Sequence, residues 1–199
     1  MPDTGPREFT AIETPRLRLI PATVELIDAV LAGAAAGVGL TVPPGWPDEH
    51  DAAFLARKRD EIAADAALAQ WVRLLLLHDG PAGASPVAAG PALVVGHAGF
   101  HGPPGVNGSG APDALELGYT VFEPWRGQGL AREAAAALIG WAAALHGIHH
   151  YFGSVSPGNA SSIAVLERLG FEHVGDQLDD VDGLELVYEL RYLPAAADT

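Results

Sequence analysis

The chain has 199 residues, no cysteine and a formal net charge of −14. This length suits one domain with a buried core, the negative charge opposes nucleic-acid binding, and the missing cysteines exclude a disulfide framework. The longest apolar stretch, residues 134–145, is too short to span a bilayer, and the N-terminus lacks the pattern of a secretion signal. We therefore expect a cytoplasmic protein, a monomer or homodimer, with no nucleic-acid or membrane partner.

The first half of the chain predicts a strand, two helices and two further strands. Residues 1–12 read as a loose polar arm, and residues 14–20 alternate like a strand. A helix over 23–31 with Thr23 as its cap and a second helix over 51–69 follow, on either side of a Pro/Gly turn at 43–47. Two strands are then expected, with a flexible hairpin loop over the low-complexity tract between them; they cover 71–77 and 92–100, and the tract covers 80–91.

The second half predicts alternating strands and helices. After a Gly/Pro loop over 102–112, we expect strands at 115–122 and 149–156 on either side of a third helix, whose core stripe comprises Leu130, Ala134, Leu138, Trp141 and Leu145. A short helix opens at Asn159 and closes at Gly170. The last strands, 171–175 and 184–192, flank an acidic turn.

This order of elements predicts an α/β (α+β) fold in one domain, residues 13–193, with a tail at 194–199. We expect about four helices and a mixed, mostly antiparallel sheet of six to seven strands. The third helix provides one parallel crossover within that sheet.

The segment R-G-Q-G-L-A at residues 126–131 stands between a predicted strand and a predicted helix. Gly127 and Gly129 let the main chain approach a ligand, the first N–H groups of the helix point at it, and Arg126 adds positive charge. A pyrophosphate would fit this cradle. Taken alone, the pattern is more often a plain tight connection.

A second segment, N-A-S-S-I-A-V-L-E-R-L-G-F at 159–171, makes the pattern specific. Together with E-L-G-Y-T-V-F-E-P-W-R-G-Q-G-L-A-R-E-A it resembles the acetyl-CoA site of the GNAT N-acetyltransferases, and most closely their RimJ/RimL-type branch. The segments G-W-P at 45–47 and G-H-A-G-F-H-G-P-P at 96–104 also resemble that branch. The similarity covers roughly residues 13–192.

The resemblance implies the GNAT fold, in which the strands at 115–122 and 149–156 splay apart and the pantetheine arm of acetyl-CoA lies between them like an extra strand. It assigns cofactor contacts to Thr120, Val121, Phe122, Arg126, Gly127, Gln128, Gly129, Leu130, Ala131, Asn159 and Ser162. Asn159 would be expected at its position without any ligand, because Asn is a preferred helix cap.

The resemblance also implies direct attack of an amine on the acetyl thioester, with a main-chain N–H near Val121 polarising the carbonyl oxygen. Glu116 is then the base that accepts the amine proton, directly or through water, although a Glu at a strand start is usually solvated or ion-paired. Many GNAT enzymes have a Tyr that protonates the departing thiolate at the position where this chain has Leu166. A thiolate needs little help to leave, and Tyr119, Tyr151, Ser154 and Ser156 remain alternative acids.

Other chemistries are less well supported. No Lys-Ser/Thr pair follows the glycines, as a Walker-type nucleotide site requires, and the sequence S-V-S-P-G at 154–158 departs from a hydrolase elbow. His146, His149 and His150 lack a metal-binding motif, so we expect no metal. We expect a structural role for His97 and His101.

The sequence thus predicts acetyl transfer from acetyl-CoA to a primary amine. The acceptor is a protein N-terminal α-amine or a small molecule such as an amino acid, a polyamine or an aminoglycoside, and a longer acyl-CoA remains open as donor. The loop at 42–51, with Trp46 among acidic residues, and the turn at 176–182 are expected to form the acceptor mouth. The alternative function is a non-catalytic acyl-CoA-binding module.

Overall fold

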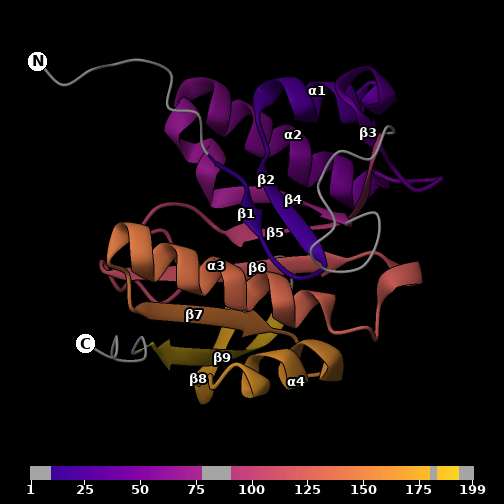
Figure 1. The fold of residues 1–199 in the computed structure, drawn as a ribbon. Helices are drawn as coiled ribbons and strands as arrows, with labels where there is room; N and C mark the ends of the chain where they lie inside the picture. The colour runs from indigo at the N-terminus through magenta and orange to yellow at the C-terminus, as the bar shows by residue number, and fades with distance from the viewer. Residues whose placement is uncertain (1–9, 78–90, 180–182, 193–199) are drawn as a thin grey trace, which may run out of the picture. The chain divides into compact units, whose positions relative to one another are not determined.

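The structure is a computed structural model that describes residues 10–77, 91–179 and 183–192. It divides into two compact units, residues 1–95 and 96–199. The single domain expected over residues 13–193 stays a prediction. The described residues form four α-helices and nine strands (Figure 1). Two of these strands, β1 (Ile12–Glu13) and β3 (Leu40–Thr41), are too short to be recognised from alternation.

The first unit contains a small antiparallel sheet and two helices. Strand β2 (Leu17–Pro21) pairs with β1 and with β4 (Val72–Leu77), while β3 runs parallel to the start of β5 (Ala92–Phe100). Helix α1 (Val24–Leu31) begins as predicted, because the side chain of Thr23 accepts a hydrogen bond from the Leu26 N–H. A short 3₁₀ helix, η1 (Ala35–Val38), separates α1 from β3.

Helix α2 (Glu49–Ala64) is shorter at its C-terminal end than predicted. The expected helix over 51–69 stops before Asp65, whose carboxylate accepts the N–H of Ala67 at 2.9 Å. An Asp that bonds to the backbone two residues further on favours a turn over a continuing helix. The chain therefore changes to a 3₁₀ helix, η2 (Ala66–Trp71), and the following strand begins at Val72 instead of Trp71.

The second unit is a five-stranded sheet in the order β5-β6-β7-β9-β8. It contains the end of β5 together with β6 (Ala114–Val121), β7 (His150–Val155), β8 (Glu172–Asp179) and β9 (Gly183–Arg191). Strands β6 and β7 are parallel and the other pairs are antiparallel. The predicted parallel crossover around the third helix is confirmed. A short 3₁₀ helix, η3 (Glu123–Trp125), follows β6.

Strands β6 and β7 separate part-way along their length. Their pairing covers Ala114 to Glu116 on β6 and ends at the pair Glu116 and Phe152, although β6 continues to Val121 and β7 to Val155. The predicted splay between these strands is therefore confirmed.

Helix α3 (Leu130–His146) contacts β6 and α4 (Ala160–Arg168), and α4 contacts β7 (Figure 1). The predicted core stripe of α3 is only partly right. Trp141 is half-buried and Leu145 is 67% exposed. The buried face is instead rich in alanines, whose small side chains allow the helix to approach the sheet closely. It comprises Leu130, Ala134, Ala135, Leu138, Ile139, Ala142 and Ala143.

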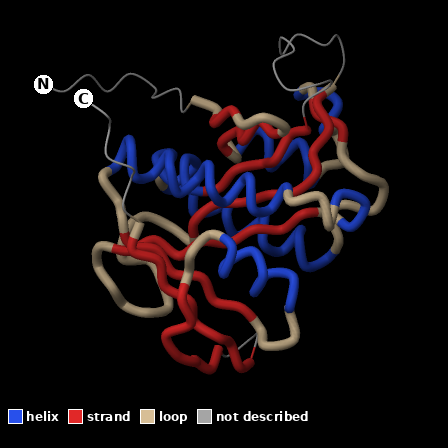
Figure 2. Tube along the Cα trace, turned by 60° about the horizontal axis from the view of Figure 1, so that its bottom comes forward, coloured by secondary structure: helices blue, strands red, loops and turns tan. Residues whose placement is uncertain are grey.

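Strands β8 and β9 form a long hairpin, seen at the bottom of Figure 2. The predicted strand over 171–175 was too short, since β8 extends to Asp179. Polar side chains obscured this extension because both faces of β8 are at least partly exposed. The predicted loop over 80–91 lies outside the described residues apart from Pro91.

Candidate functional site

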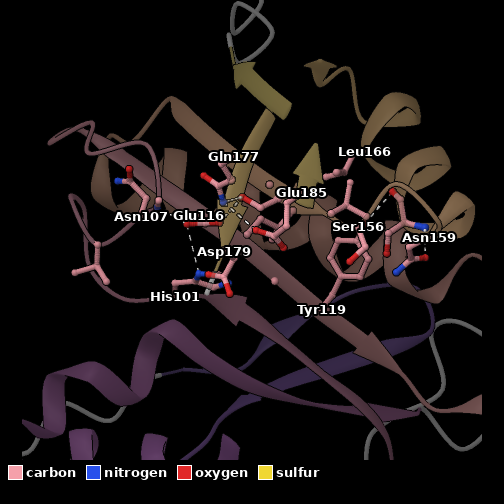
Figure 3. Close-up of a pocket in the computed structure, with 18 residues that line it drawn as sticks. His101, Asn107, Glu116, Tyr119, Ser156, Asn159, Leu166, Gln177, Asp179 and Glu185 are labelled. Atoms are coloured by element: carbon pink, nitrogen blue, oxygen red, sulfur yellow. Dashed lines mark hydrogen bonds and ion pairs between the residues drawn. The ribbon is translucent and has the colours of Figure 1, made fainter. Parts of the chain in front are cut away.

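Two cavities border the place where β6 and β7 separate. The first has a volume of about 600 Å³ and is called the acidic cavity, because Glu116, Asp179 and Glu185 line it. Figure 3 shows these three residues with His101 and Gln177 at one end, and Tyr119, Ser156, Leu166 and Asn159 at the other. No Lys or Arg is among the described residues that line this cavity.

Glu116 is a buried carboxylate of the acidic cavity. It lies on β6 at the last residue paired with β7, and it is only 3% exposed. Its Oε1 accepts the hydroxyl of Ser154 at 2.8 Å, and its Oε2 accepts the Gly108 N–H at 2.7 Å. The Nδ1 of His101 lies 3.4 Å from Oε2. Both carboxylate oxygens are therefore held in fixed directions.

These contacts determine the charge of Glu116. Burial raises the pKa of its carboxyl group, but His101, the Gly108 N–H and the Ser154 hydroxyl together outweigh burial, and the pKa falls to about 2. The residue is thus a carboxylate at every physiological pH. A fixed, buried negative charge attracts a protonated amine.

A chain of hydrogen bonds extends from Glu116 to the β8–β9 hairpin. The side-chain amide of Gln177 donates to the Ser154 hydroxyl at 3.1 Å and to Oε2 of Glu185 at 2.9 Å. Gln177 and Glu185 are direct neighbours across the hairpin. The chain links β6, β7, β8 and β9 around one end of the cavity.

The loop between β5 and β6 completes this wall. The Nδ2 of Asn107 donates to the carbonyls of Ala111 and Ala114, and its Oδ1 accepts from Ala111 and Ser109. Asn107 therefore shapes its own loop and brings the Gly108 N–H onto Glu116.

The second cavity, about 440 Å³, is called the arginine-lined cavity, because Arg126 and Arg168 line it. It contains the strand-to-helix turn, where Gly127 and Gly129 have φ values of 73° and 78°. Glycine adopts this left-handed conformation without strain. Gly129 is the N-cap of α3 and has no side chain to cap the first N–H groups, which therefore suit an anion.

Arg126 is tied to the end of β6, because its Nε donates to the Val121 carbonyl at 2.9 Å. The other guanidinium nitrogens of Arg126 make no hydrogen bond to the described residues. The positive charge of Arg126 therefore lies beside the turn. Together with Arg168 on α4, it gives this cavity two positive charges, and no Asp or Glu is among its described lining residues.

The two cavities adjoin each other at Tyr119, Asn159 and Ser162, which line both. The Tyr119 hydroxyl donates to the Ser162 carbonyl at 3.2 Å. Asn159 caps α4, since its Oδ1 accepts the Ser162 N–H at 3.1 Å. A ligand with an anionic end and a reactive end could therefore extend from one cavity into the other.

A comparison with protein families agrees with this geometry. The model of the acetyltransferase (GNAT) domain matches residues 16–172. The chain belongs to the GNAT family. Members of this family use acetyl-CoA as the acetyl donor, and the fold and family predicted from the sequence are confirmed.

Individual relatives support the RimJ/RimL-type branch within the GNAT family. The [ribosomal protein uS5]-alanine N-acetyltransferase of Escherichia coli is 38% identical over 66 residues. This match spans 33% of the chain and 34% of that relative, about a third of its length.

Solved GNAT structures share the fold. One is an acetyltransferase from Salmonella typhimurium that modifies the N-terminal serine of ribosomal protein L7/L12; the TM-score is 0.59 at 17% identity, covering 92% of this chain and 99% of that one. A second is RimL, the ribosomal L7/L12 α-N-protein acetyltransferase, in complex with coenzyme A. Its TM-score is 0.59 at 18% identity, and the match covers 90% of this chain and 96% of that one.

Most residues that the GNAT resemblance assigned to the cofactor gather around the arginine-lined cavity. Nine of the eleven line it, namely Thr120, Val121, Arg126, Gly127, Gly129, Leu130, Ala131, Asn159 and Ser162. Phe122 is buried, and Gln128 is exposed with its Nε2 3.4 Å from the Pro124 carbonyl. Neither of these two lines the cavity.

The main-chain directions along β6 refine the expected contacts to pantetheine. The His101 N–H donates to the Glu116 carbonyl, so the main-chain groups of Glu116 and Thr120 point toward β5. Those of Tyr119 and Val121 consequently point toward β7, where the strands separate. The main-chain groups of Thr120 therefore face β5 and not the place where β6 and β7 separate.

The residues expected at the acceptor mouth separate into different parts of the structure. Trp46 lies in the first unit, outside the one that contains both cavities, so its acceptor contact stays a prediction. From the turn over 176–182, Gln177 and Asp179 line the acidic cavity, and 180–182 lie outside the described residues.

The alternative acids also differ in position. Leu166, where many GNAT enzymes have Tyr, is 2% exposed, lines the acidic cavity and packs near Gly153. Tyr151 is fully buried with its hydroxyl on the Ile139 and Ile148 carbonyls, which removes it as an acid. Of the remaining hydroxyl groups, Tyr119 borders both cavities and burial raises its pKa.

Sequence reasoning missed two polar residues of the acidic cavity, His101 and Glu185. His101 was assigned a structural role, but it lies against Gly118 and faces Glu116. Glu185 was not singled out, and Gln177 was expected only as part of the turn over 176–182, because the contact between them depends on a cross-strand pairing. The signal in the sequence that could have indicated them is the alternation of polar residues on both sides of the final turn.

The described residues contain no group of three His, Cys, Asp or Glu side chains arranged to hold a metal. His150 instead contacts Asp113 at 3.3 Å and Glu189 at 2.8 Å. Within the same residues, no helix has the length and apolar character needed to cross a membrane.

Proposed function

We propose that this protein transfers the acetyl group of acetyl-CoA to a primary amine by direct attack on the thioester. The observation that carries this proposal is the opposite charge of the two adjoining cavities. The arginine-lined cavity suits the phosphates of CoA, and the acidic cavity suits a protonated amine. Tyr119, Asn159 and Ser162 border the place where the two ligands would meet.

The proposed cofactor contacts are the nine assigned residues that line the arginine-lined cavity, with the turn at 126–131 receiving the pyrophosphate. Gly127 and Gly129 allow the close approach, and Arg126 adds charge. The pantetheine arm would extend along β6, where the main-chain groups of Tyr119 and Val121 face β7. The Val121 N–H would then polarise the thioester carbonyl.

Glu116 is the proposed catalytic carboxylate. With a pKa of about 2, it is a weak proton acceptor but a permanent anion. It would attract the ammonium group and orient a water molecule that carries the amine proton toward solvent. Once the amine is neutral, its lone pair attacks the carbonyl carbon, and the tetrahedral intermediate collapses as the CoA thiolate leaves. The nitrogen then loses its extra proton, which the thiolate takes up directly or through water, so the products are the neutral amide and CoA thiol.

The acceptor we favour is the α-amine of a protein N-terminus. The names of the similar proteins support this choice, because they act on an alanine of ribosomal protein uS5 and an N-terminal serine of L7/L12. Proton chemistry agrees, since about one-tenth of α-amines but only about one in 2,500 lysine amines are neutral at pH 7.

The test is an acetylation assay with acetyl-CoA in which products are identified by mass. Two amidated peptides of equal length serve as acceptors, one with a free α-amine and no Lys, the other with a blocked N-terminus and one Lys. We expect acetylation of the α-amine at a higher kcat/KM. Binding of acetyl-CoA without turnover of any amine would instead establish the non-catalytic acyl-CoA-binding module.

A further inference from the structure

The described residues that line the acidic cavity include no Lys or Arg that could pair with an anionic group of an acceptor. Three carboxylates, Glu116, Asp179 and Glu185, line it. His101 is the one basic side chain among its described lining residues, and its Nδ1 already faces Glu116 at 3.4 Å.

The hydrogen-bond donors near Glu116 are also engaged by the protein. The Gly108 N–H and the Ser154 hydroxyl both donate to Glu116. The side-chain amide of Gln177 has two N–H groups, and they serve the Ser154 oxygen and Glu185. A carboxylate that entered this end of the cavity would meet negative charge and few donors.

We propose that the acidic cavity selects amines that have no carboxylate beside the amine, and that Glu185 is a specificity-determining residue of this selection. This inference rests on the proposed function and narrows its acceptor class. A free amino acid would be rejected, because its carboxylate lies one carbon from the amine and must enter the cavity with it. An amine beside an amide, as at a peptide N-terminus, would be accepted.

The physical reason is that the carboxylates of the cavity repel the carboxylate of the acceptor, and no Lys or Arg among the described lining residues offsets this repulsion. At about 6 Å and an effective dielectric constant of about 20, two negative charges repel by an energy equivalent to about a hundredfold in affinity. Solvent at the open side of the cavity weakens this to about tenfold. An amide in place of the carboxylate carries no charge, and its N–H groups can donate to Asp179 or Glu185.

Alaninamide and alanine are the acceptors for the test. They differ in the group beside the amine, and kcat/KM is measured over a range of pH and divided by the neutral fraction of each amine. We expect alaninamide to react about tenfold faster than alanine.

The variant is Glu185→Lys, with Glu185→Gln as a milder change. Glu172→Lys is the matched control, because it makes the same charge change on the same hairpin at an exposed residue that lines neither cavity. We expect the preference for alaninamide to fall about tenfold in Glu185→Lys and to persist in Glu172→Lys. Retention of the acetyl-CoA-induced rise in melting temperature shows that each variant is folded.

The outcomes separate the two proposals. Equal turnover of alanine and alaninamide would overturn the charge selection while acetyl transfer to amines stands. An unchanged preference in both Glu185 variants would overturn the role of Glu185. Acetyl-CoA binding with no turnover of any acceptor would overturn the proposed function, and the charge selection with it.

Discussion

The hydroxyl of Ser154 on β7 donates to the carboxylate of Glu116 on β6 at 2.8 Å. Main-chain pairing between these strands ends at Glu116 and Phe152. A side-chain hydrogen bond therefore continues the connection where the backbone ladder stops. It positions the negative charge of the acidic cavity at the place where the strands separate.

Replacing Ser154 with Ala should weaken this connection. Because a hydrogen bond to a charged group contributes about 1.5–3 kcal/mol, we expect the free energy of unfolding to fall by about that amount and the pKa of Glu116 to rise. Urea denaturation measures the first effect. Ser156→Ala, two residues further on at an exposed position, is the control, and an equal loss in both variants would contradict the special role of Ser154.

Glu116 should make stability depend on acid. Its folded pKa of about 2 is below the unfolded value of 4.5, so its contribution is complete above 4.5 and is lost as the pH falls toward 2. We expect a contribution of about 2 kcal/mol, because solvent screens part of the interaction with exposed His101. Denaturation between these pH values should be less pH-dependent in Glu116→Gln than in the exposed control Glu172→Gln. Equal pH dependence in the two variants would refute the lowered pKa.

The proposed pyrophosphate site predicts that Gly129 does not tolerate a side chain. In Gly129→Val a branched side chain meets a φ of 78° and obstructs the first N–H groups of α3. We expect the rise in melting temperature with acetyl-CoA to disappear. Gly140→Ala, in the same helix with open space around it, should keep the full rise. A full rise in Gly129→Val would exclude this turn as the phosphate site.

Asn159 has two roles that one substitution separates. Asp caps a helix about as well as Asn, but it places an anion beside the proposed cofactor and cannot donate a hydrogen bond. Asn159→Asp should therefore keep its melting temperature and lose affinity for acetyl-CoA about tenfold. Asn159→Ala is the companion variant. If it loses stability while Asn159→Asp binds normally, the residue is a helix cap only.

The role of Glu116 in turnover can be read from a pH profile. A carboxyl group with a pKa of about 2 does not titrate near neutrality, so Glu116→Gln should lower kcat/KM by a constant factor, about tenfold to a hundredfold, between about pH 6 and about pH 9. Such a profile identifies an anion that positions the amine. Recovery of the rate toward about pH 9 would instead make Glu116 the proton acceptor.

The sequence by itself determined the family, the order of most elements and the glycine turn that we propose as the phosphate cradle. These features are local: Gly127 and Gly129 stand in one turn, and Thr23 and Asn159 cap the helices that follow them. Local patterns also misled, since the end of α2 depended on how Asp65 bonds to the backbone. The buried face of α3 depended on the packing of its alanines.

Only the tertiary structure decided the acidic cavity. Glu116, Ser154, Gln177 and Glu185 come from four strands and meet because β7 pairs with β9 and β9 with β8. The low pKa of Glu116 likewise depends on His101, which directly follows β5, and on Gly108, which lies in the loop between β5 and β6. Spacing along a sequence encodes the contacts within one turn or helix, whereas contacts between distant strands depend on sheet order and register, which no single segment specifies.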